Sequence, residues 1–420
     1  MSESSNIFPV EWNRTTLGAL AAYINGYAFK PFDWGKEGLP IIRIEQINNP
    51  DARCDYYSGP VPDRHFIDNG TLLFSWSATL TVLIWNRGPA YLNQHIFKVS
   101  PKEGVDKHFL FHLINFNLES LGGHAHGSTM RHIKRSDLLP YPVVVPSDEA
   151  EQRRIAEILD TLDDAIQKTE QLINKLKQIK QGLLHDLLTR GIDENGQLRD
   201  PIAHPEQFKD SVLGRIPKGW KVCALETVAQ IERGKFAHRP RNDPRFYGGE
   251  FPFVQTGDIT AAQGEVFSNY SQTLNARGAA VSRSFPENTI AITIAANIAD
   301  TGILGIPMYF PDSVVGAIVH KPHNVRFVEL AIRLSKHRLD ARAPQSAQKN
   351  INLQDLRPLL ISLPTPQEQF QIAEIYEAYA DCINAERQHI QKLITIKKSL
   401  MHDLLTGKVR VTSISGEQHV

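Results

Sequence analysis

Two long stretches of the chain, residues 151–189 and 368–406, share one hydrophobic pattern. In each stretch, apolar residues recur at alternating steps of four and three, the heptad spacing of an α-helix that buries one stripe. Polar residues break this seam at equivalent places, Thr169 with Glu386 and Lys180 with Lys397. The apolar seam positions are Ile155, Leu159, Leu162, Ile166, Ile173, Leu176, Leu183 and Leu187 in the first stretch, and Ile372, Tyr376, Tyr379, Ile383, Ile390, Leu393, Leu400 and Leu404 in the second.

The two stretches form an internal repeat. A shift of 217 positions aligns them without a gap, and 20 of the 39 residues are identical. Neither contains proline, so each predicts a helix of about 57 Å. A helix with one apolar stripe must bury that stripe. We expect the two helices to pack on each other as an antiparallel coiled coil, because their seams match throughout. Packing of each helix on its own neighbouring domain is the alternative.

Each long stretch follows a block with the pattern of a mixed α/β domain. Short β-branched or aromatic runs, such as residues 71–74 and 314–319, predict strands, and residues 106–121 predict a helix. The predicted fold class is α+β, with two mixed α/β domains joined by two long helices in a pseudo-twofold antiparallel coiled coil. The predicted segments are 1–150 for the first domain, 151–192 for the first long helix, 193–210 for a polar linker without elements, 211–366 for the second domain, 367–410 for the second long helix and 411–420 for a flexible tail.

The two blocks share landmark residues at equivalent positions, and their sequences differ in the segments between these landmarks. Trp12 near the start of the first block corresponds to Trp220 in the second, and Gly26 corresponds to Gly234. Between such landmarks the sequences diverge widely. A common framework with unlike interiors is typical of two related domains that have different targets.

Composition and charge narrow the class of protein. The chain is 41% hydrophobic and 22% charged, as soluble globular proteins are, and no apolar run approaches the ~20 residues that span a bilayer. Cys54, Cys223 and Cys382 lie far apart, which favours a cytoplasmic location over a disulfide framework. The net charge is zero, yet residues 211–366 carry +6, from 18 basic and 12 acidic side chains. Contact with nucleic acid would therefore be local, through basic segments.

We expect no catalytic residue, metal or cofactor in this chain. The sequence lacks a phosphate-binding loop of the Gly-x-x-x-x-Gly-Lys-Ser/Thr type. Residues 48–51 resemble an amino-methyltransferase motif but lack the aromatic side chain that would stack on a flipped base, so we interpret them as a turn. The pairs His185–Asp186 and His402–Asp403 recur at the ends of both predicted helices, where histidine favours the helix dipole. We expect them to serve structure or subunit docking.

Basic segments are the candidates for DNA contact, and we interpret them as loops. Arg and Lys bind phosphates, while Arg, Gln and Asn can pair bidentately with guanine or adenine edges. A plain solvated surface is the alternative interpretation. The candidates are Arg131, Lys134 and Arg135 in the first block, and Arg233, Lys235, Arg239, Arg241, Arg245, Arg338, Arg342, Gln348 and Lys349 in the second.

The duplicated order of these features resembles the specificity (S) subunit of type I restriction–modification enzymes. The motifs that carry the resemblance are the Glu-Gln-x-x-Ile-Ala-Glu-Ile opening and His-Asp-Leu-Leu-Thr ending of both long stretches, together with residues 74–79, 92–97 and 216–220. It spans about residues 7 to 409. The resemblance implies two target recognition domains, each of which reads one half of a bipartite double-stranded DNA site.

The same resemblance implies that this chain is not an enzyme by itself. The helices would set the spacer of the DNA site and dock methyltransferase (M) subunits, two in number, that bind S-adenosylmethionine and methylate adenine. Restriction/translocase (R) subunits would add DNA cleavage driven by ATP with Mg²⁺, as in phage defence. The alternatives are a self-contained DNA methyltransferase or restriction enzyme, and a structural coiled-coil linker, for which two divergent domains would be superfluous.

Overall fold

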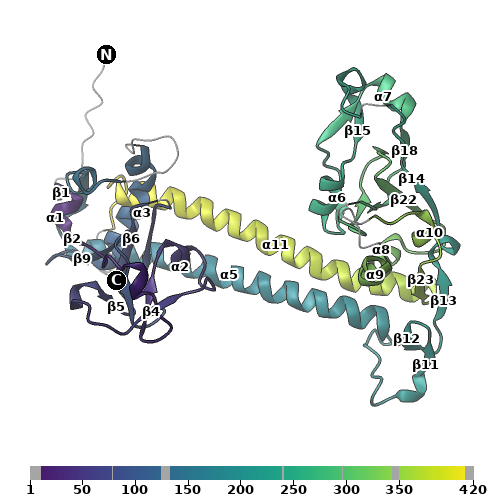
Figure 1. The fold of residues 1–420 in the computed structure, drawn as a ribbon, viewed down its shortest axis with the longest axis horizontal. Helices are drawn as coiled ribbons and strands as arrows, with labels where there is room; N and C mark the ends of the chain where they lie inside the picture. Colours follow the sequence, from purple (N-terminus) through teal and green to yellow (C-terminus); the bar gives the residue numbers. More distant parts are fainter. Residues whose placement is uncertain are drawn as a thin grey trace, which may run out of the picture. The chain divides into compact units, whose positions relative to one another are not determined.

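The computed structural model describes residues 11–411, apart from 78, 124–132, 239–240, 296 and 343–349, and apart from the side chain of Arg342. The chain divides into two compact units, Met1–Gln171 with Arg387–Val420, and Leu172–Glu386. Both divisions fall within long helices, so each unit holds one mixed domain and one half of each helix (Figure 1). The predicted tail, 411–420, lies outside the described residues except for Val411.

The two repeated stretches form helix α5, Glu149–Thr189, and helix α11, Pro366–Leu405. The Asp148 side chain accepts a main-chain N–H at 2.9 Å at the start of α5, and Thr365 does so at 3.3 Å at the start of α11. A short polar side chain at this position satisfies one of the N–H groups that a first helical turn leaves unpaired. Both helices therefore begin at equivalent residues, two positions before the aligned repeat.

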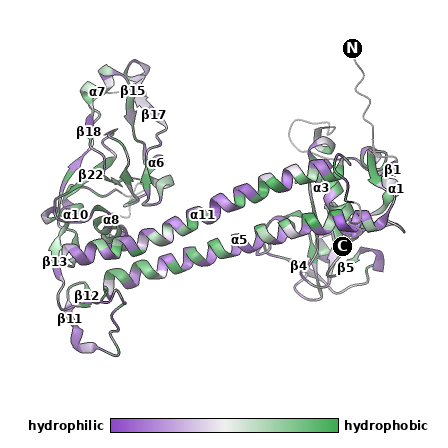
Figure 2. Ribbon diagram, turned by 180° about the vertical axis from the view of Figure 1, so that it is seen from behind, coloured by the Kyte–Doolittle hydropathy of each residue, from purple (hydrophilic) through white to green (hydrophobic). Residues whose placement is uncertain are grey.

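Within each unit the two helices run antiparallel and bury their seams. In the first unit Leu159 packs in one core with Leu404, and in the second Leu187 packs with Ile372. Every apolar seam position predicted from the heptad pattern is buried or half-buried. Figure 2 shows the polar and apolar residues that alternate along both helices. The predicted antiparallel pair of long helices is confirmed, and with it the α+β class.

The two lysines that interrupt the seam have defined partners. Lys180 Nζ lies 2.6 Å from Glu265 Oε1 and 4.5 Å from the centre of the Tyr376 ring. Lys397 pairs with Asp163 of α5. An ammonium group near a carboxylate or over an aromatic face is stabilised electrostatically. These polar seam positions are therefore accommodated by specific contacts.

The first domain consists of two four-stranded sheets, a two-stranded ribbon and short helices. The sheet orders are β2-β9-β6-β7 and β4-β3-β8-β5, and the ribbon is β1-β10. The strands are β1 (Trp12–Thr16), β2 (Ala21–Asn25), β3 (Leu39–Ile42), β4 (Asp55–Tyr57), β5 (Phe66–Ile67), β6 (Leu72–Ser75), β7 (Thr81–Ile84), β8 (Ala90–Leu92), β9 (Ile96–Pro101) and β10 (Pro142–Pro146). The helices are α1 (Leu17–Leu20), α2 (Ile44–Asn48), α3 (Lys107–Gly123) and α4 (Arg135–Leu138), with 3₁₀ turns η1 (Pro31–Asp33) and η2 (Asp63–His65).

The second domain has the same plan with more strands. Its sheets are β14-β22-β19-β20-β16 and β17-β15-β21-β18, with ribbons β11-β12 and β13-β23. The strands are β11 (Phe208–Ser211), β12 (Gly214–Pro217), β13 (Lys221–Ala224), β14 (Ala229–Arg233), β15 (Tyr247–Phe253), β16 (Val266–Phe267), β17 (Gln272–Leu274), β18 (Arg283–Phe285), β19 (Ile290–Thr293), β20 (Thr301–Leu304), β21 (Met308–Phe310), β22 (Val314–Val319) and β23 (Leu360–Leu363). The helices are α6 (Thr256–Ala262), α7 (Ala276–Val281), α8 (Val325–Leu334), α9 (Lys336–Arg342) and α10 (Leu353–Leu356), with 3₁₀ turns η3 (Pro205–Gln207), η4 (Leu225–Thr227) and η5 (Pro244–Phe246).

The two domains are topologically equivalent. Strands β2, β9, β6 and β7 occupy the places of β14, β22, β19 and β20, and within this sheet only β16 has no counterpart among the described strands of the first domain. The ribbon β11-β12 is also without a counterpart among those strands. Each second sheet contains one parallel pair, β3 with β8 and β15 with β21. Helices α3 and α8 follow the equivalent strands β9 and β22. A loop in one domain can therefore be matched with its counterpart in the other.

The identical Glu-Gln pair that opens both long helices joins each helix to its domain. Gln152 accepts a hydrogen bond from the Asp106 N–H at 3.0 Å, and Gln369 accepts one from the Asn324 N–H at 3.1 Å. Each glutamine also donates to a proline carbonyl at 3.0 Å. Asp106 and Asn324 directly precede α3 and α8. Both glutamines are buried, and both hold the domain helix against the long helix through main-chain groups, while Gln369 Nε2 also lies 3.2 Å from His323 Nδ1.

Two expectations from the sequence are wrong. The segment 193–210 contains the turn η3 and the first residues of strand β11, and Phe208 is buried. Leu198 also packs against the core of the second unit, and Arg199 pairs with Glu368 of α11 at 2.6 Å, so the polar segment is fixed by a few specific contacts. The basic residues from Arg333 to Arg342 lie on helices α8 and α9, where we expected a loop.

An acid-sensitive contact joins α3 to α5. His112 Nε2 lies 2.7 Å from Asp160 Oδ1, and the His112 side chain is fully buried, with Asp163 and Lys397 also facing it. Burial lowers the pKa of His112 below its usual value, although Asp160 acts in the opposite sense. Below pH 6.5, His112 therefore binds a proton more readily in the unfolded chain than in the folded chain.

The stability of the first unit is accordingly expected to fall as the pH falls from 7.5 to 5.5. Unfolding of wild type and His112→Gln by denaturant at several pH values checks this, and the variant should show the weaker pH dependence. His389→Gln, a change at an exposed histidine of α11, is the matched control and should keep the wild-type slope. Equal slopes in all three proteins would mean that His112 does not control the acid sensitivity.

Candidate nucleic-acid interface

Exposed guanidinium groups gather on the loop between β14 and β15. Arg241 lies 2.6 Å from the Asp312 carboxylate, and Arg233 donates from Nε to the Asp312 carbonyl. Both arginines are exposed. Asp312 belongs to the turn before β22. It therefore holds the two arginines at the edge of the sheet that contains β14 and β22. An exposed guanidinium group that is held in place by hydrogen bonds is suited to bidentate contact with a phosphate or a guanine edge.

Arg245 lies on the same loop and is also braced. Its NH2 atom is 2.6 Å from Asp243 Oδ2, and the His238 ring nitrogen Nε2 is 3.0 Å from that oxygen. The hydrogen bonds from Arg245, aided by His238, hold the pKa of Asp243 well below its usual value. The carboxylate therefore stays charged at neutral pH and keeps Arg245 in place. Lys235 on this loop is exposed as well.

A cavity of about 460 Å³ opens beside these arginines. Arg233, Arg241, Asn350 and Asn352 line it, with Ile294. Guanidinium and amide groups around an open cavity can present donors and acceptors to the edge of a base. The sequence-predicted residues Arg233 and Arg241 thus come together with Asn350, which follows the second basic cluster in the sequence, and with Asn352, which the sequence did not indicate.

The second basic cluster of this domain has a different character. The Arg333 guanidinium pairs with Glu329 at 2.7 Å and donates to the Tyr376 hydroxyl at 2.7 Å. Arg338 is half-buried and donates to the Leu360 carbonyl at 3.0 Å. These contacts join α8 and α9 to the long helix and to β23. We therefore assign Arg338 a structural role, and its use in DNA contact remains an expectation.

The remaining candidates are placed only in part. Lys134 and Arg135 are exposed at the start of α4. Helix α9 includes Arg342, but its side chain is not described. The other candidates, which lie outside the described residues, are Arg131, Arg239, Gln348 and Lys349.

The loop of the first domain that matches the basic loop is aromatic. Strands β2 and β3 are equivalent to β14 and β15, and the segment between them holds exposed Phe32 and Trp34. None of the predicted DNA-contact residues lies on this aromatic loop, because those residues were chosen chiefly for their positive charge. Matching the sequence from Gly26 and Gly234 forward would have located it.

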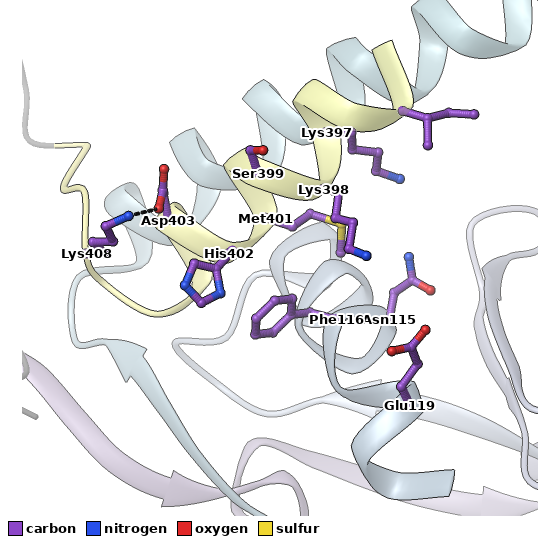
Figure 3. A pocket seen from close by; sticks show the side chains of 11 residues that line it. Asn115, Phe116, Glu119, Lys397, Lys398, Ser399, Met401, His402, Asp403 and Lys408 are labelled. Carbon is purple, nitrogen blue, oxygen red and sulfur yellow. Dashed lines mark hydrogen bonds and ion pairs between the residues drawn. The ribbon is translucent and has the colours of Figure 1, made fainter. Parts of the chain in front are cut away.

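A groove lies between α3 and the last turns of α11 in the first unit (Figure 3). Its volume is about 700 Å³. Apolar and cationic side chains line it together, so it suits a partner segment with an apolar stripe and acidic flanks. The lining residues are Asn115, Phe116, Glu119, Ile394, Lys397, Lys398, Ser399, Met401, His402, Asp403 and Lys408.

The repeated His-Asp pairs do not form hydrogen-bonded dyads. His185 Nδ1 is 3.8 Å from Asp186, beyond hydrogen-bond reach, and Asp403 accepts from Lys408 Nζ at 2.9 Å. Within the described ranges, no three His, Cys, Asp or Glu side chains are grouped to hold a metal ion. Among the helices that the structure describes, none is long and apolar enough to cross a membrane.

Comparison with known proteins gives one consistent result. The family model described as the type I restriction modification DNA specificity domain matches residues 9–178 and 217–395. The EcoBI specificity subunit of Escherichia coli is 26% identical over 95% of this chain and 86% of its own length. The putative MjaX specificity subunit of Methanocaldococcus jannaschii is 26% identical over 96% of this chain and 95% of its own length.

Solved structures show the same fold. The S subunit of a type I restriction–modification system from M. genitalium aligns with a TM-score of 0.56 at 15% identity, over 98% of this chain and 99% of that one. A chain from a type I R-M system, solved in a study of complex assembly and conformational transition, aligns with a TM-score of 0.61 at 15% identity, over 96% of this chain and 100% of that one. The two matched segments together exceed half of the chain and include both repeated domains, and the chain therefore belongs to the type I restriction modification DNA specificity family.

Proposed function

We propose that this chain is the DNA sequence-specificity subunit of a type I restriction–modification complex and that each domain reads one half of an asymmetric bipartite site. One observation carries the proposal. Two domains of the same topology present unlike side chains on equivalent loops, a basic loop between β14 and β15 and an aromatic one between β2 and β3. Two domains of the same fold that present different side chains on these loops are suited to recognise two different half-sites.

Positive charge supports DNA as the ligand. Arg241 and Arg245 are exposed and oriented by carboxylates of the same domain. Such groups fix phosphates, and Arg with Asn can read guanine and adenine edges in the major groove. The DNA contacts of the second domain would thus centre on the cavity that Arg233, Asn350 and Asn352 line.

The chemistry of the complex would belong to other subunits. The comparisons give no support to a self-contained methyltransferase or restriction enzyme. In the proposed complex, M subunits, two in number, carry S-adenosylmethionine and methylate adenine, and R subunits cleave DNA with ATP and Mg²⁺. The long helices would dock the M subunits and fix the spacer between the two half-sites.

Methylome sequencing of host cells with and without this chain tests the function. The expected result is adenine methylation at an asymmetric bipartite motif that disappears with the chain. Arg241→Ala should relax one half of the motif and leave the other half unchanged. Persistence of every methylated motif without the chain would reject the proposal.

The groove of Figure 3 is the proposed docking site for an M subunit. Ser399 lies on its wall, and the equivalent repeat position holds Gly182. A Cβ added at Gly182 would meet nothing within 4 Å. Small residues at both equivalent positions keep the surface of the long helices open beside His402 and His185.

Ser399→Trp should therefore weaken binding of the M subunit about tenfold or more while the chain stays folded. Sedimentation of mixtures of the two proteins measures this. Gln391→Trp is the matched control, because Gln391 is exposed on the same helix and does not line the groove. Equal binding by both variants would move the docking site elsewhere on the chain.

A further inference from the structure

The 3₁₀ turns η1 and η5 occupy one topological position in the two domains. Turn η1, Pro31–Asp33, lies between β2 and β3, and η5, Pro244–Phe246, lies between the equivalent strands β14 and β15. Proline opens both turns. Phe32 in the first domain therefore corresponds to Arg245 in the second.

Glycine sets the path of both loops. A Cβ on Gly26 would lie 2.2 Å from the Asn93 carbonyl oxygen, and a Cβ on Gly234 would lie 2.2 Å from the Pro311 carbonyl oxygen. Real Cβ contacts are never this short, so only glycine allows the main chain to pass so close to the neighbouring turn. The two loops consequently leave the sheet in the same way, and their tips can be compared.

Large aromatic side chains are exposed at the tip of the first domain. Phe32 is 86% exposed, Trp34 is 48% exposed and Tyr56 is 36% exposed. The Arg43 guanidinium lies 4.7 Å from the centre of the Trp34 ring. A cluster of exposed aromatic rings marks a binding surface more often than scattered apolar residues do.

The aromatic tip is braced by hydrogen bonds. The Lys30 N–H donates to Asp33 Oδ2 at 2.7 Å. Gly35 and Tyr56 exchange main-chain bonds, with N–O distances of 2.9 and 3.1 Å. Phe32 is therefore presented on a fixed turn, and little conformational entropy is lost when it meets a ligand.

The aromatic ring of the second-domain turn packs inside its own domain. The Phe246 ring stacks on His238 with centroids 4.1 Å apart, while Arg245 is the exposed side chain of that turn. One domain thus presents a cation and the other an aromatic ring at the same point of the scaffold. Because the second-domain turn belongs to the basic surface described above, the first-domain turn faces the same kind of ligand.

We infer that Phe32, supported by Trp34, is a base-contacting residue of the first domain and reads its half-site through apolar contact with DNA. This inference rests on the proposed function. Aromatic and aliphatic side chains recognise DNA by contact with a thymine methyl group or by insertion at a flexible base step. Exposed Lys30 and Lys36 flank the turn and supply phosphate contacts. An apolar contact with a base contributes to DNA affinity in a way that depends little on the salt concentration.

The test uses the full chain in complex with its methyltransferase partner and duplexes that carry the site found by methylome sequencing. The first-domain half-site is the one that Arg241→Ala leaves unchanged. Phe32→Ala should lower the affinity for this duplex about tenfold with an unaltered salt dependence, and should relax only the first-domain half-site. Phe32→Tyr should retain most of the affinity. A 2-aminopurine base in that half-site should change fluorescence on binding wild type and not on binding Phe32→Ala.

Ile202→Ala, a change at a 90% exposed apolar residue, is the matched control and should bind as wild type does. Unchanged affinity and motif with Phe32→Ala would overturn the inference while the proposed function stands. Loss of the methyltransferase partner from Phe32→Ala, with normal DNA affinity of the complex that remains, would also overturn it, since the turn would then contact protein. A wild-type complex without any sequence preference would instead reject the proposed function.

Discussion

Glu329→Ala is expected to lower the free energy of unfolding of the second unit by about 3–5 kcal/mol. Glu329 is fully buried, and it pairs with Arg333 at 2.7 Å and with Arg326 at 3.2 Å. It also accepts a hydrogen bond from the Thr301 hydroxyl at 2.6 Å. Burial tends to lower the pKa of Arg333, but the Glu329 charge outweighs it, so the pKa is raised. Without Glu329, the half-buried Arg333 loses its ion-pair partner and the buried Arg326 loses one of its carboxylate partners.

Hydrogen exchange of the second-unit amides during denaturant unfolding measures this loss. Glu329→Gln keeps an acceptor for Thr301 and removes the charge, so its cost separates the ion pairs from the hydrogen bond. Glu374→Ala, at an exposed position of α11, should change stability by less than about 0.5 kcal/mol. A similarly small effect of Glu329→Ala would show that the other carboxylates are enough to neutralise the charge of Arg326. These are Glu265 and Glu377, which also pair with Arg326.

Leu159→Asp should unfold or dissociate the helix pair of the first unit and abolish methylation by the complex. Leu159 has no exposed surface and packs in the core that holds Leu404. Truncation of such a leucine costs about 2–5 kcal/mol, and a buried carboxylate without a partner adds to this loss. Leu176 is only half-buried, so Leu176→Asp should have the smaller effect.

Circular dichroism and methylation assays of the reconstituted complex check the seam prediction. Leu172→Asp is the matched control, because Leu172 is 42% exposed on the same helix. It should leave helicity and activity near wild type. If Leu159→Asp preserved the cooperative unfolding of the wild-type chain, the seam would not stabilise the unit.

The long helices could be predicted because their signal is local and repeated. Leu159, Leu187 and Ile372 recur with the helical period, and each is buried in the structure. Helix α8 also has a periodic apolar face, but its polar face carries Arg326 and Glu329, which resemble surface residues and yet are buried as partners. Periodicity detects apolar stripes, and it does not show that the ionic side chains of such a helix are buried as well.

The candidate interface was predictable only in its charges. Clustered arginines indicated the loop that carries Arg241 and Arg245, but the same rule selected Arg338, whose guanidinium bonds to a main-chain carbonyl. Sequence proximity does not reveal whether a cation is solvated or paired in three dimensions. Phe32 was missed for the converse reason, because an aromatic residue in a loop has no charge pattern to mark it.

The buried glutamines at the starts of α5 and α11 have an evolutionary consequence. Gln152 contacts its domain through main-chain N–H and carbonyl groups, and Gln369 does so too, with one further contact to the His323 ring. A position that contributes only its main-chain N–H can hold any residue except proline, which lacks that N–H. Most substitutions before α3 or α8 therefore leave these main-chain hydrogen bonds intact, and selection for a new DNA target can proceed without a compensating change in the helices. A lineage could replace one whole domain by recombination, from β1 through β10, and retain a working frame for the other.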